Sequence, residues 1–195
     1  MSVQEQQIML TVLSAEMDLT RLGIYICLFT GIRIGELCAL TWDDISLENN
    51  MIHIHRTMQR IQTPSGEKKT AILIAEPKSQ CSIRDIPIAG TLREKLLQQP
   101  VRQGYVLTGS KNKYVESRTM QNRFKEILDE CEIRNAHFHT LRHTFATRCI
   151  EVGFDVKSLN EILGHANVSI TLNCYVHPSM ESMPIYKQKV GIIVL

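Results

Sequence analysis

The segment HTLRH, residues 139–143, concentrates side chains that bind anions. If the segment is helical, His139, Arg142 and His143 are three or four positions apart and share one face. Three potential cations on one face would repel one another unless an anion lay opposite them. A helix start also favours an anion, because its free N–H groups and dipole are positive. The cluster therefore predicts a site for an anionic group.

The same two histidines form an H-x-x-x-H pair, a spacing that also occurs in zinc sites. Metalloproteases place Glu directly after the first His, whereas this chain has Thr140, and no acidic or cysteine ligand adjoins the pair. This pattern disfavours a metal, and we expect no metal and no cofactor. A helical metal-binding protein that uses the chain's seven histidines is kept as an alternative.

Other candidate groups lie far from this segment in the chain. Arg33 follows a glycine bend, and Glu36, one helical turn on, could orient its guanidinium for phosphate. Lys78 lies in a turn between two predicted strands and could donate a proton if its pKa were lowered. His165 follows a glycine at a helix corner, and Tyr175 comes ten residues later; a tyrosine is a nucleophile only when activated. Singly, these residues are more often surface salt bridges, solvated lysines or packed aromatic rings.

Apolar spacing and capping residues predict the helices that would position these groups. Ser2 and Glu5 resemble a capping box that opens a first helix, and an apolar run ends at Gly31, a typical left-handed cap. Several later segments begin at Ser, Thr or Asp, and two end at Gly. The helices predicted after the first are 22–30, 91–99, 117–133, 140–153, 155–164 and 169–175.

Three segments are predicted strands: 51–58, which alternates apolar and polar residues, 70–76, which follows the turn TPSGE, and 82–88, which follows the bend at PKSQ. Together they predict a small three-stranded antiparallel sheet. The predicted fold class is therefore α+β, mainly α-helical with this small sheet at one edge.

Length and composition are those of an ordinary domain. The 195 residues are 44% hydrophobic, and 22 basic against 20 acidic residues give a net charge of only +2. Global charge neither demands nor excludes a nucleic-acid partner, so any basic site must be local. Six scattered cysteines without a C-x-x-C pair indicate buried free thiols in a reducing compartment. With no secretory signal or long apolar stretch, we expect a cytoplasmic protein that does not enter a membrane.

Four stretches, in order, resemble the catalytic domain of the tyrosine recombinase (phage integrase) family: TGIRIGEL, PKSQCSIRDIPI, HTLRHTFAT and LGHANVSITLNCYVH. The last stretch, with ten residues from His to Tyr, is similar to integrases of conjugative transposons and related phages. The resemblance covers residues from about 5 to about 180. It implies that the anion opposite HTLRH is the scissile phosphodiester of duplex DNA.

The resemblance also implies roles for individual residues. Tyr175 would attack the phosphorus and form a 3′-phosphotyrosyl link, while Arg33, Arg142 and His165 stabilise the charge of the transition state. Family members exchange DNA strands in this way without metal or ATP. The product of this chemistry would be integration or excision of a mobile element.

The remaining motif positions would support that chemistry. Lys78 would protonate the departing 5′ oxygen, and His139 is the candidate acceptor of the tyrosine proton. Glu36 would orient Arg33 or His139, and we read His143 as packing support rather than as a catalytic group. Rival positions are Lys68 and Lys69 for the acid, and Tyr186 for the nucleophile.

The resemblance sets expectations for the whole molecule as well. We expect residues 1–195 to form a single catalytic domain, with 181–195 as a tail that packs in cis or on a neighbouring protomer, and with the family's N-terminal core-binding domain absent. The isolated domain would be a monomer, and the full-length protein a homotetramer on double-stranded DNA. Alternatives are a type IB topoisomerase-like activity or a catalytically silent DNA-binding relative. Candidate phosphate contacts are Arg56, Arg60, Lys111, Lys113, Arg118 and Arg123.

Overall fold

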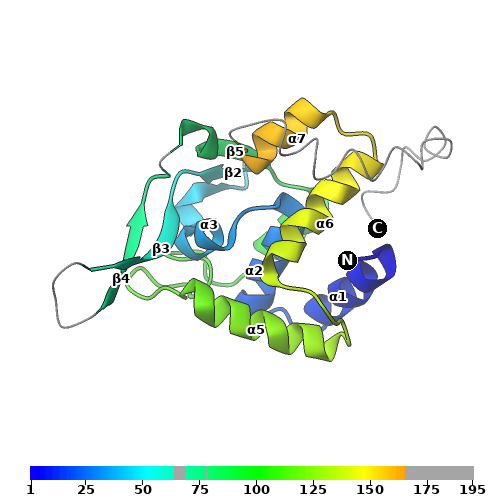
Figure 1. Ribbon diagram of the computed structural model, residues 1–195, viewed down its shortest axis with the longest axis horizontal. Helices are drawn as coiled ribbons and strands as arrows, with labels where there is room; N and C mark the ends of the chain where they lie inside the picture. The colour runs from blue at the N-terminus through cyan, green and yellow to red at the C-terminus, as the bar shows by residue number, and fades with distance from the viewer. Residues whose placement is uncertain (64–68, 78, 166–195) are drawn as a thin grey trace.

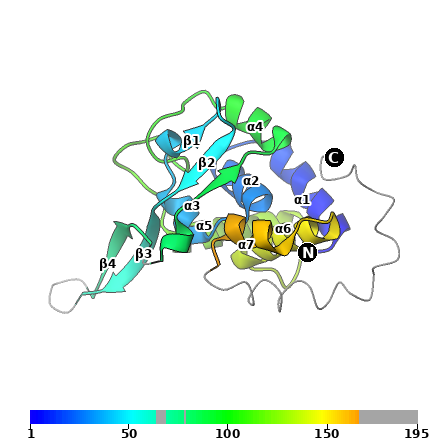
Figure 2. The ribbon, with the colours of Figure 1, turned by 90° about the horizontal axis from the view of Figure 1, so that it is seen from above.

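The computed structural model describes residues 1–63, 69–77 and 79–165 of the chain (Figure 1). Helices dominate this part, and the small β-sheet region lies to one side of them (Figure 1 and Figure 2). Within the described ranges, no helix combines the length and apolar character required to cross a bilayer. The helices are α1 (Val3–Ala15), α2 (Leu19–Thr30), α3 (Ile34–Ala39), α4 (Gly90–Leu97), α5 (Ser117–Glu130), α6 (Phe138–Glu151) and α7 (Val156–Leu163), with two short 3₁₀ helices, η1 (Trp42–Asp44) and η2 (Gln80–Ser82).

The helix ends follow from local chemistry. Ser2 and Glu5 form the predicted capping box at the start of α1. Helix α2 ends at Gly31 in the predicted left-handed conformation, with φ of 66°. Helix α6 begins at Phe138, two residues before the predicted start at Thr140, so that the first histidine of HTLRH lies in the first turn. The predicted helix over 169–175 lies outside the described residues.

The predicted fold class is confirmed, but the strand assignment needs a correction. The three-stranded antiparallel sheet consists of β1 (Ile45–Ser46), β2 (Met51–Ile54) and β5 (Arg84–Pro87), in the order β1-β2-β5. The strands β3 (Thr57–Gln62) and β4 (Thr70–Ala75) pair only with each other, as a hairpin that projects from the body (Figure 2). The predicted strand 51–58 is therefore two strands, which separate at residues 55 and 56.

The break between β2 and β3 has a physical cause in the side chains at that point. Arg56 turns back to donate hydrogen bonds to the Asp44 carboxylate (2.9 Å) and to the Thr41 hydroxyl (3.0 Å). This contact holds the chain against η1, where it leaves the plane of the first sheet. The hairpin then continues in a new direction.

The core consists of two clusters of unequal size. The larger one joins the helices α1 to α6 and the inward face of the sheet, where Ile52, Ile54 and Ile86 are almost completely buried. The smaller one lies between α6 and α7. Among the described residues its buried members are Ala146, Cys149, Leu159 and Leu163, and Phe145 and Ile150 pack against it. Hydrogen bonds from three arginines add to this packing at the end of α7.

Candidate active site

The bend between α2 and α3 presents the first candidate side chain, Arg33. Gly31 makes this bend possible, since its φ is positive and a Cβ there would lie 2.6 Å from the Phe145 ring and 2.9 Å from Leu163. The Glu36 carboxylate accepts hydrogen bonds from the Arg33 backbone N–H and from its Nη1, both at 2.8 Å. The Arg33 side chain is 37% exposed, so it remains accessible to a ligand.

Helix α6 contributes Arg142, which is one of the largest fully buried side chains of the protein. Its Nη1 donates to the Gly31 carbonyl and its Nη2 to the Leu163 carbonyl, each over 2.7 Å. The guanidinium thus ties the α2–α3 bend to the end of α7.

The two histidines of HTLRH lie beside this arginine. The rings of His139 and His143 meet edge to face, with centroids 4.7 Å apart. His139 is exposed, whereas His143 is half-buried. This placement agrees with the shared helical face predicted from their spacing.

The end of α7 places His165. Gly164 closes the helix with φ of 64°, and its N–H donates to the Asn160 carbonyl at 2.9 Å. The Asn160 amide in turn donates to the His165 carbonyl at 3.1 Å. The backbone of this turn is therefore fixed from within the helix.

Three consecutive carbonyl oxygens at this helix end accept hydrogen bonds from three different arginines. The Ile162 oxygen accepts from Arg84 Nε (2.5 Å), the Leu163 oxygen from Arg142 Nη2 (2.7 Å) and the Gly164 oxygen from Arg33 Nη2 (2.9 Å). The last carbonyls of a helix lack partners in the helix and carry the negative end of its dipole. The helix end therefore gathers cations that would otherwise repel one another.

Arg84, in β5, was not among the residues singled out from the sequence. Its Nη2 and Nη1 donate to the two oxygens of Glu36, at 2.9 and 3.1 Å, and both side chains are buried. Glu36 thus accepts from Arg33 and from Arg84. The alternation of SIRDIPI contained a signal for this residue, because Arg84 stands in the same inward-facing series as Ile86 and Ile88.

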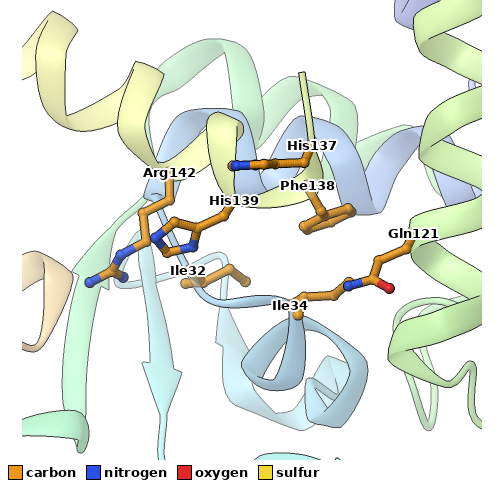
Figure 3. Close-up of a pocket in the computed structure, with 7 residues that line it drawn as sticks. All are labelled: Ile32, Ile34, Gln121, His137, Phe138, His139 and Arg142. Atoms are coloured by element: carbon orange, nitrogen blue, oxygen red, sulfur yellow. The ribbon is translucent and has the colours of Figure 1, made fainter. Parts of the chain in front are cut away.

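A pocket of about 330 Å³ opens beside these cations. His139 and Arg142 form one side of it, and Gln121 reaches toward it from α5 (Figure 3). Ile32, Ile34 and Phe138 give it an apolar lining. The pocket thus combines an apolar surface with one charged side chain, that of Arg142, which suits a ligand with an anionic group joined to a less polar body.

The electrostatic field of the arginines acts on both histidines that face the site. Partial burial, followed by His143 and Arg142, lowers the pKa of His139 to about 4. Burial, followed by Arg142 and Arg33, lowers the pKa of His165 to about 4 as well. Both rings are therefore neutral at pH 7. Burial, followed by His137 and Arg142, also lowers the pKa of His143, the second histidine of HTLRH. Of the three potential cations in HTLRH, Arg142 therefore carries the charge, and the histidines can accept or donate a proton.

The two arginines beside Glu36 outweigh the effect of burial on its pKa. Burial alone would raise it, but hydrogen bonds and charge from Arg84, together with Arg33, lower its pKa below the usual range. Glu36 is therefore ionised. In the part of the chain that the structure describes, no three His, Cys, Asp or Glu side chains gather closely enough to hold a metal ion.

The other predicted site residues are placed less completely. Lys78, Tyr175 and the rivals Lys68 and Tyr186 lie outside the described residues. Among the candidate phosphate contacts, Lys111, Lys113 and Arg118 are exposed. The other three have protein partners: Arg56 binds Asp44, Arg60 binds Glu116, and Arg123 donates to Thr20.

With this geometry established, comparison with known proteins decides the family. The family model described as "Phage integrase family" matches residues 2–182, nearly the whole chain. The chain belongs to the phage integrase family. The resemblance predicted from the order of the motifs is therefore confirmed. The arginines and histidines described above belong to those motifs.

Individual members of the phage integrase family show similar sequences. A "Tyrosine recombinase XerC-like" protein of Caldanaerobacter subterraneus subsp. tengcongensis is 32% identical over 167 residues, which cover 76% of this chain and 43% of that protein. The "Transposase from transposon Tn916" of Enterococcus faecalis is 27% identical over 177 residues, covering 82% of this chain and 42% of that protein. The chain thus spans less than half the length of these relatives.

Solved structures confirm the fold. The Tn1549 transposon integrase, in complex with circular intermediate DNA, superposes with a TM-score of 0.73 at 25% identity, covering 93% of this chain and 64% of that chain. XerA recombinase superposes with a TM-score of 0.66 at 22% identity, covering 95% of this chain and 65% of that chain. The described architecture is therefore that of the tyrosine recombinase catalytic domain.

Proposed function

We propose that this chain cleaves and rejoins DNA strands as the catalytic domain of a site-specific recombinase, in the integration or excision of a mobile element. The observation that carries the proposal is the convergence of Arg33 and Arg142 on the turn that bears His165. These side chains come from three distant segments, yet they surround one position beside the pocket. Membership of the phage integrase family supports a DNA phosphodiester as the ligand at that position.

The proposed reaction begins with attack on the phosphorus. The Tyr175 hydroxyl oxygen forms a bond to phosphorus, its proton passes to neutral His139, and the bond from phosphorus to the 5′ oxygen breaks. Lys78 donates a proton to that oxygen. Since a phosphodiester is exchanged for a phosphotyrosyl ester, no nucleoside triphosphate is consumed.

The described residues supply the electrostatic part of this step. Arg33 and Arg142 face the non-bridging oxygens, whose negative charge grows in the transition state. His165, being neutral, contributes a hydrogen bond rather than a charge. Fixed donors of this kind need little reorganisation during the reaction, which is why their placement matters more than their number.

Rejoining reverses the same chemistry. The 5′-hydroxyl of a second strand attacks the phosphotyrosyl bond, and Tyr175 leaves with its proton restored. For strand exchange between two DNA sites, we propose a homotetramer of the full-length protein on double-stranded DNA, in the cytoplasm. The names of the relatives, a transposase and a recombinase, support this assignment over supercoil relaxation of the topoisomerase type.

A covalent trap tests the proposal. A pool of nicked duplexes with a randomised core is incubated with the protein in EDTA, and adducts that survive denaturation are recovered and sequenced. The nick lets the short cleaved fragment diffuse away, so the phosphotyrosyl adduct accumulates. We expect an adduct with the wild type and with Tyr186→Phe, and none with Tyr175→Phe. Failure of the wild type to form any adduct would favour a silent DNA-binding relative instead.

A further inference from the structure

Arg84 is a buried cation whose polar atoms are all engaged. Its side chain is only 6% exposed. Nε donates to the Ile162 carbonyl, Nη1 to the Ser82 carbonyl (2.9 Å), and both terminal nitrogens to Glu36. One side chain therefore connects β5, η2, α3 and the end of α7.

The position of Arg84 in its strand means that burying its charge costs free energy. Arg84 pairs with Ile54 across the sheet and faces inward, as Ile86 does two residues later. An apolar residue would fill such a position without the cost of removing a charge from water. A buried ion pair is weak evidence for stability, so its value has to be sought in what it orients.

What Arg84 orients is the turn that carries His165. Gly164 packs directly over it: a Cβ at Gly164 would lie 3.1 Å from Arg84 Cδ, 3.1 Å from its Nη1 and 3.0 Å from the Cys81 carbonyl. The hydrogen bond from Arg84 Nε to the Ile162 carbonyl holds the same turn. Arg84 therefore contacts this turn both by packing against Gly164 and by the hydrogen bond to Ile162.

Arg84 also sets the charge that Arg33 presents. Glu36 carries one negative charge and lies between two guanidinium groups. Without Arg84, the Glu36 charge would be balanced by Arg33 alone, and an arginine so neutralised stabilises less strongly the extra charge that develops on the phosphate in the transition state. With Arg84 present, the cluster of Arg33, Arg84 and Glu36 keeps a net positive charge.

We propose that Arg84 is a positioning residue for strand cleavage, which holds the His165 turn and offsets the Glu36 charge so that Arg33 and His165 face the scissile phosphate. This inference rests on the proposed function. It assigns Arg84 no contact with DNA. Its effect should therefore fall on the rate of the chemical step and not on DNA affinity.

The test compares Arg84→Met with a matched control, Arg21→Met. Arg21 is also mostly buried, and it donates to a carboxylate (Glu130, 2.8 Å) and to a backbone carbonyl (Val12, 2.6 Å), but it lies away from the site. The substrate is the nicked duplex recovered with the wild type by covalent trapping. Single-turnover cleavage is measured at saturating DNA, well below the melting temperature of both variants.

We expect Arg84→Met to lower the cleavage rate 10- to 100-fold, the usual range for residues that orient a site's primary ligands. Its dissociation constant for the duplex should stay within about threefold of the wild type. Arg21→Met should cleave at the wild-type rate. A cleavage rate within threefold of the wild type for Arg84→Met, or an equal loss in Arg21→Met, would overturn the proposal.

A second readout needs no DNA. Arg84 is among the cations that lower the pKa of His165, so its removal should raise that pKa, measured from the ring resonances of the free protein. If the wild type forms no adduct, the proposed function fails, but this titration still reports on Arg84. If Arg84→Met does not fold, Arg84→Lys is the variant to test, because lysine keeps the positive charge but lacks the forked guanidinium group. A cleavage rate about tenfold below the wild type supports the proposal. An unchanged rate overturns it.

Discussion

Arg33 and Arg142 donate hydrogen bonds to neighbouring carbonyl oxygens, those of Gly164 and Leu163, at the end of one short helix. The two arginines come from opposite halves of the chain. The negative end of the α7 dipole and the Glu36 carboxylate stabilise them in the absence of DNA. These contacts hold the two guanidinium groups side by side at one helix end.

The glycine at this helix end should be less replaceable than other glycines of similar conformation. Gly164→Ala introduces a Cβ at positive φ, which costs about 1–2 kcal/mol, and presses it against Arg84 and the Cys81 carbonyl. Gly153→Ala is the control, since its φ is also positive (87°) but nothing lies within 4 Å of the new Cβ. Urea unfolding should show a larger loss for Gly164→Ala. Equal losses would mean that the turn does not depend on its packing against Arg84.

Acid should weaken the fold partly through His165. Its pKa is about 4 in the folded protein and about 6.5 when unfolded, so above pH 6.5 both states are neutral and the full stability is present. Between pH 6.5 and 4, His165 binds a proton in the unfolded state but not in the folded state, so the free energy of unfolding decreases. The free energy of unfolding of the wild type should therefore fall relative to that of His165→Gln as pH is lowered through this range. Parallel curves for the two proteins would contradict the lowered pKa.

The acid role of Lys78 can be separated from a role in binding. Lys78→Ala should slow cleavage of an ordinary 5′-oxygen substrate far more than cleavage of the same duplex with a 5′-sulfur leaving group, because a thiolate leaves without needing a proton. The two single-turnover rates give the comparison. If both substrates suffer the same loss, Lys78 is not the acid, and Lys69→Ala becomes the next variant to compare.

The six basic candidates for phosphate contact should differ in how they affect DNA binding. Lys111, Lys113 and Arg118 are exposed, so replacing each by Ala should reduce the slope of log affinity against log salt by about 1. Arg56→Ala leaves the largely buried Asp44 carboxylate without its arginine, and its main cost should be stability. Salt titrations of duplex binding, with melting curves beside them, measure both effects. If the variants of Lys111, Lys113 and Arg118 lose stability but show no change in the salt slope of binding, these residues do not contact DNA.

Much of this site could be predicted from the sequence, because its parts are local motifs. The bend at Gly31 and the helix end at Gly164 are capping patterns that can be recognised in the sequence. The motifs HTLRH and LGH contain Arg142 and His165 themselves. The strand assignment was less accurate, since the turn of Arg56 toward Asp44 is a tertiary contact that no alternation reveals. The neutral state of His139 and His165 likewise depends on burial and on arginines from other segments.

Arg84 shows the limit most clearly. Its position in SIRDIPI matches an inward-facing series, but an arginine at the end of a short strand is usually solvated. Only the approach of Glu36 and of the α7 carbonyls, from distant parts of the chain, makes it a buried member of the site. Such a residue is found from coordinates and not from spacing.

The central claim, that Arg33 and its neighbours surround one phosphate, is tested most directly by changing the charge of that phosphate. Single-turnover cleavage by the wild type and by Arg33→Ala is compared on a duplex with an ordinary scissile phosphodiester and on one with a neutral methylphosphonate at that position. Arg33→Ala should lose about 10²–10³ in rate on the phosphodiester and less than about tenfold on the methylphosphonate, because the charge that Arg33 balances is then absent. Equal losses on the two substrates would contradict the account.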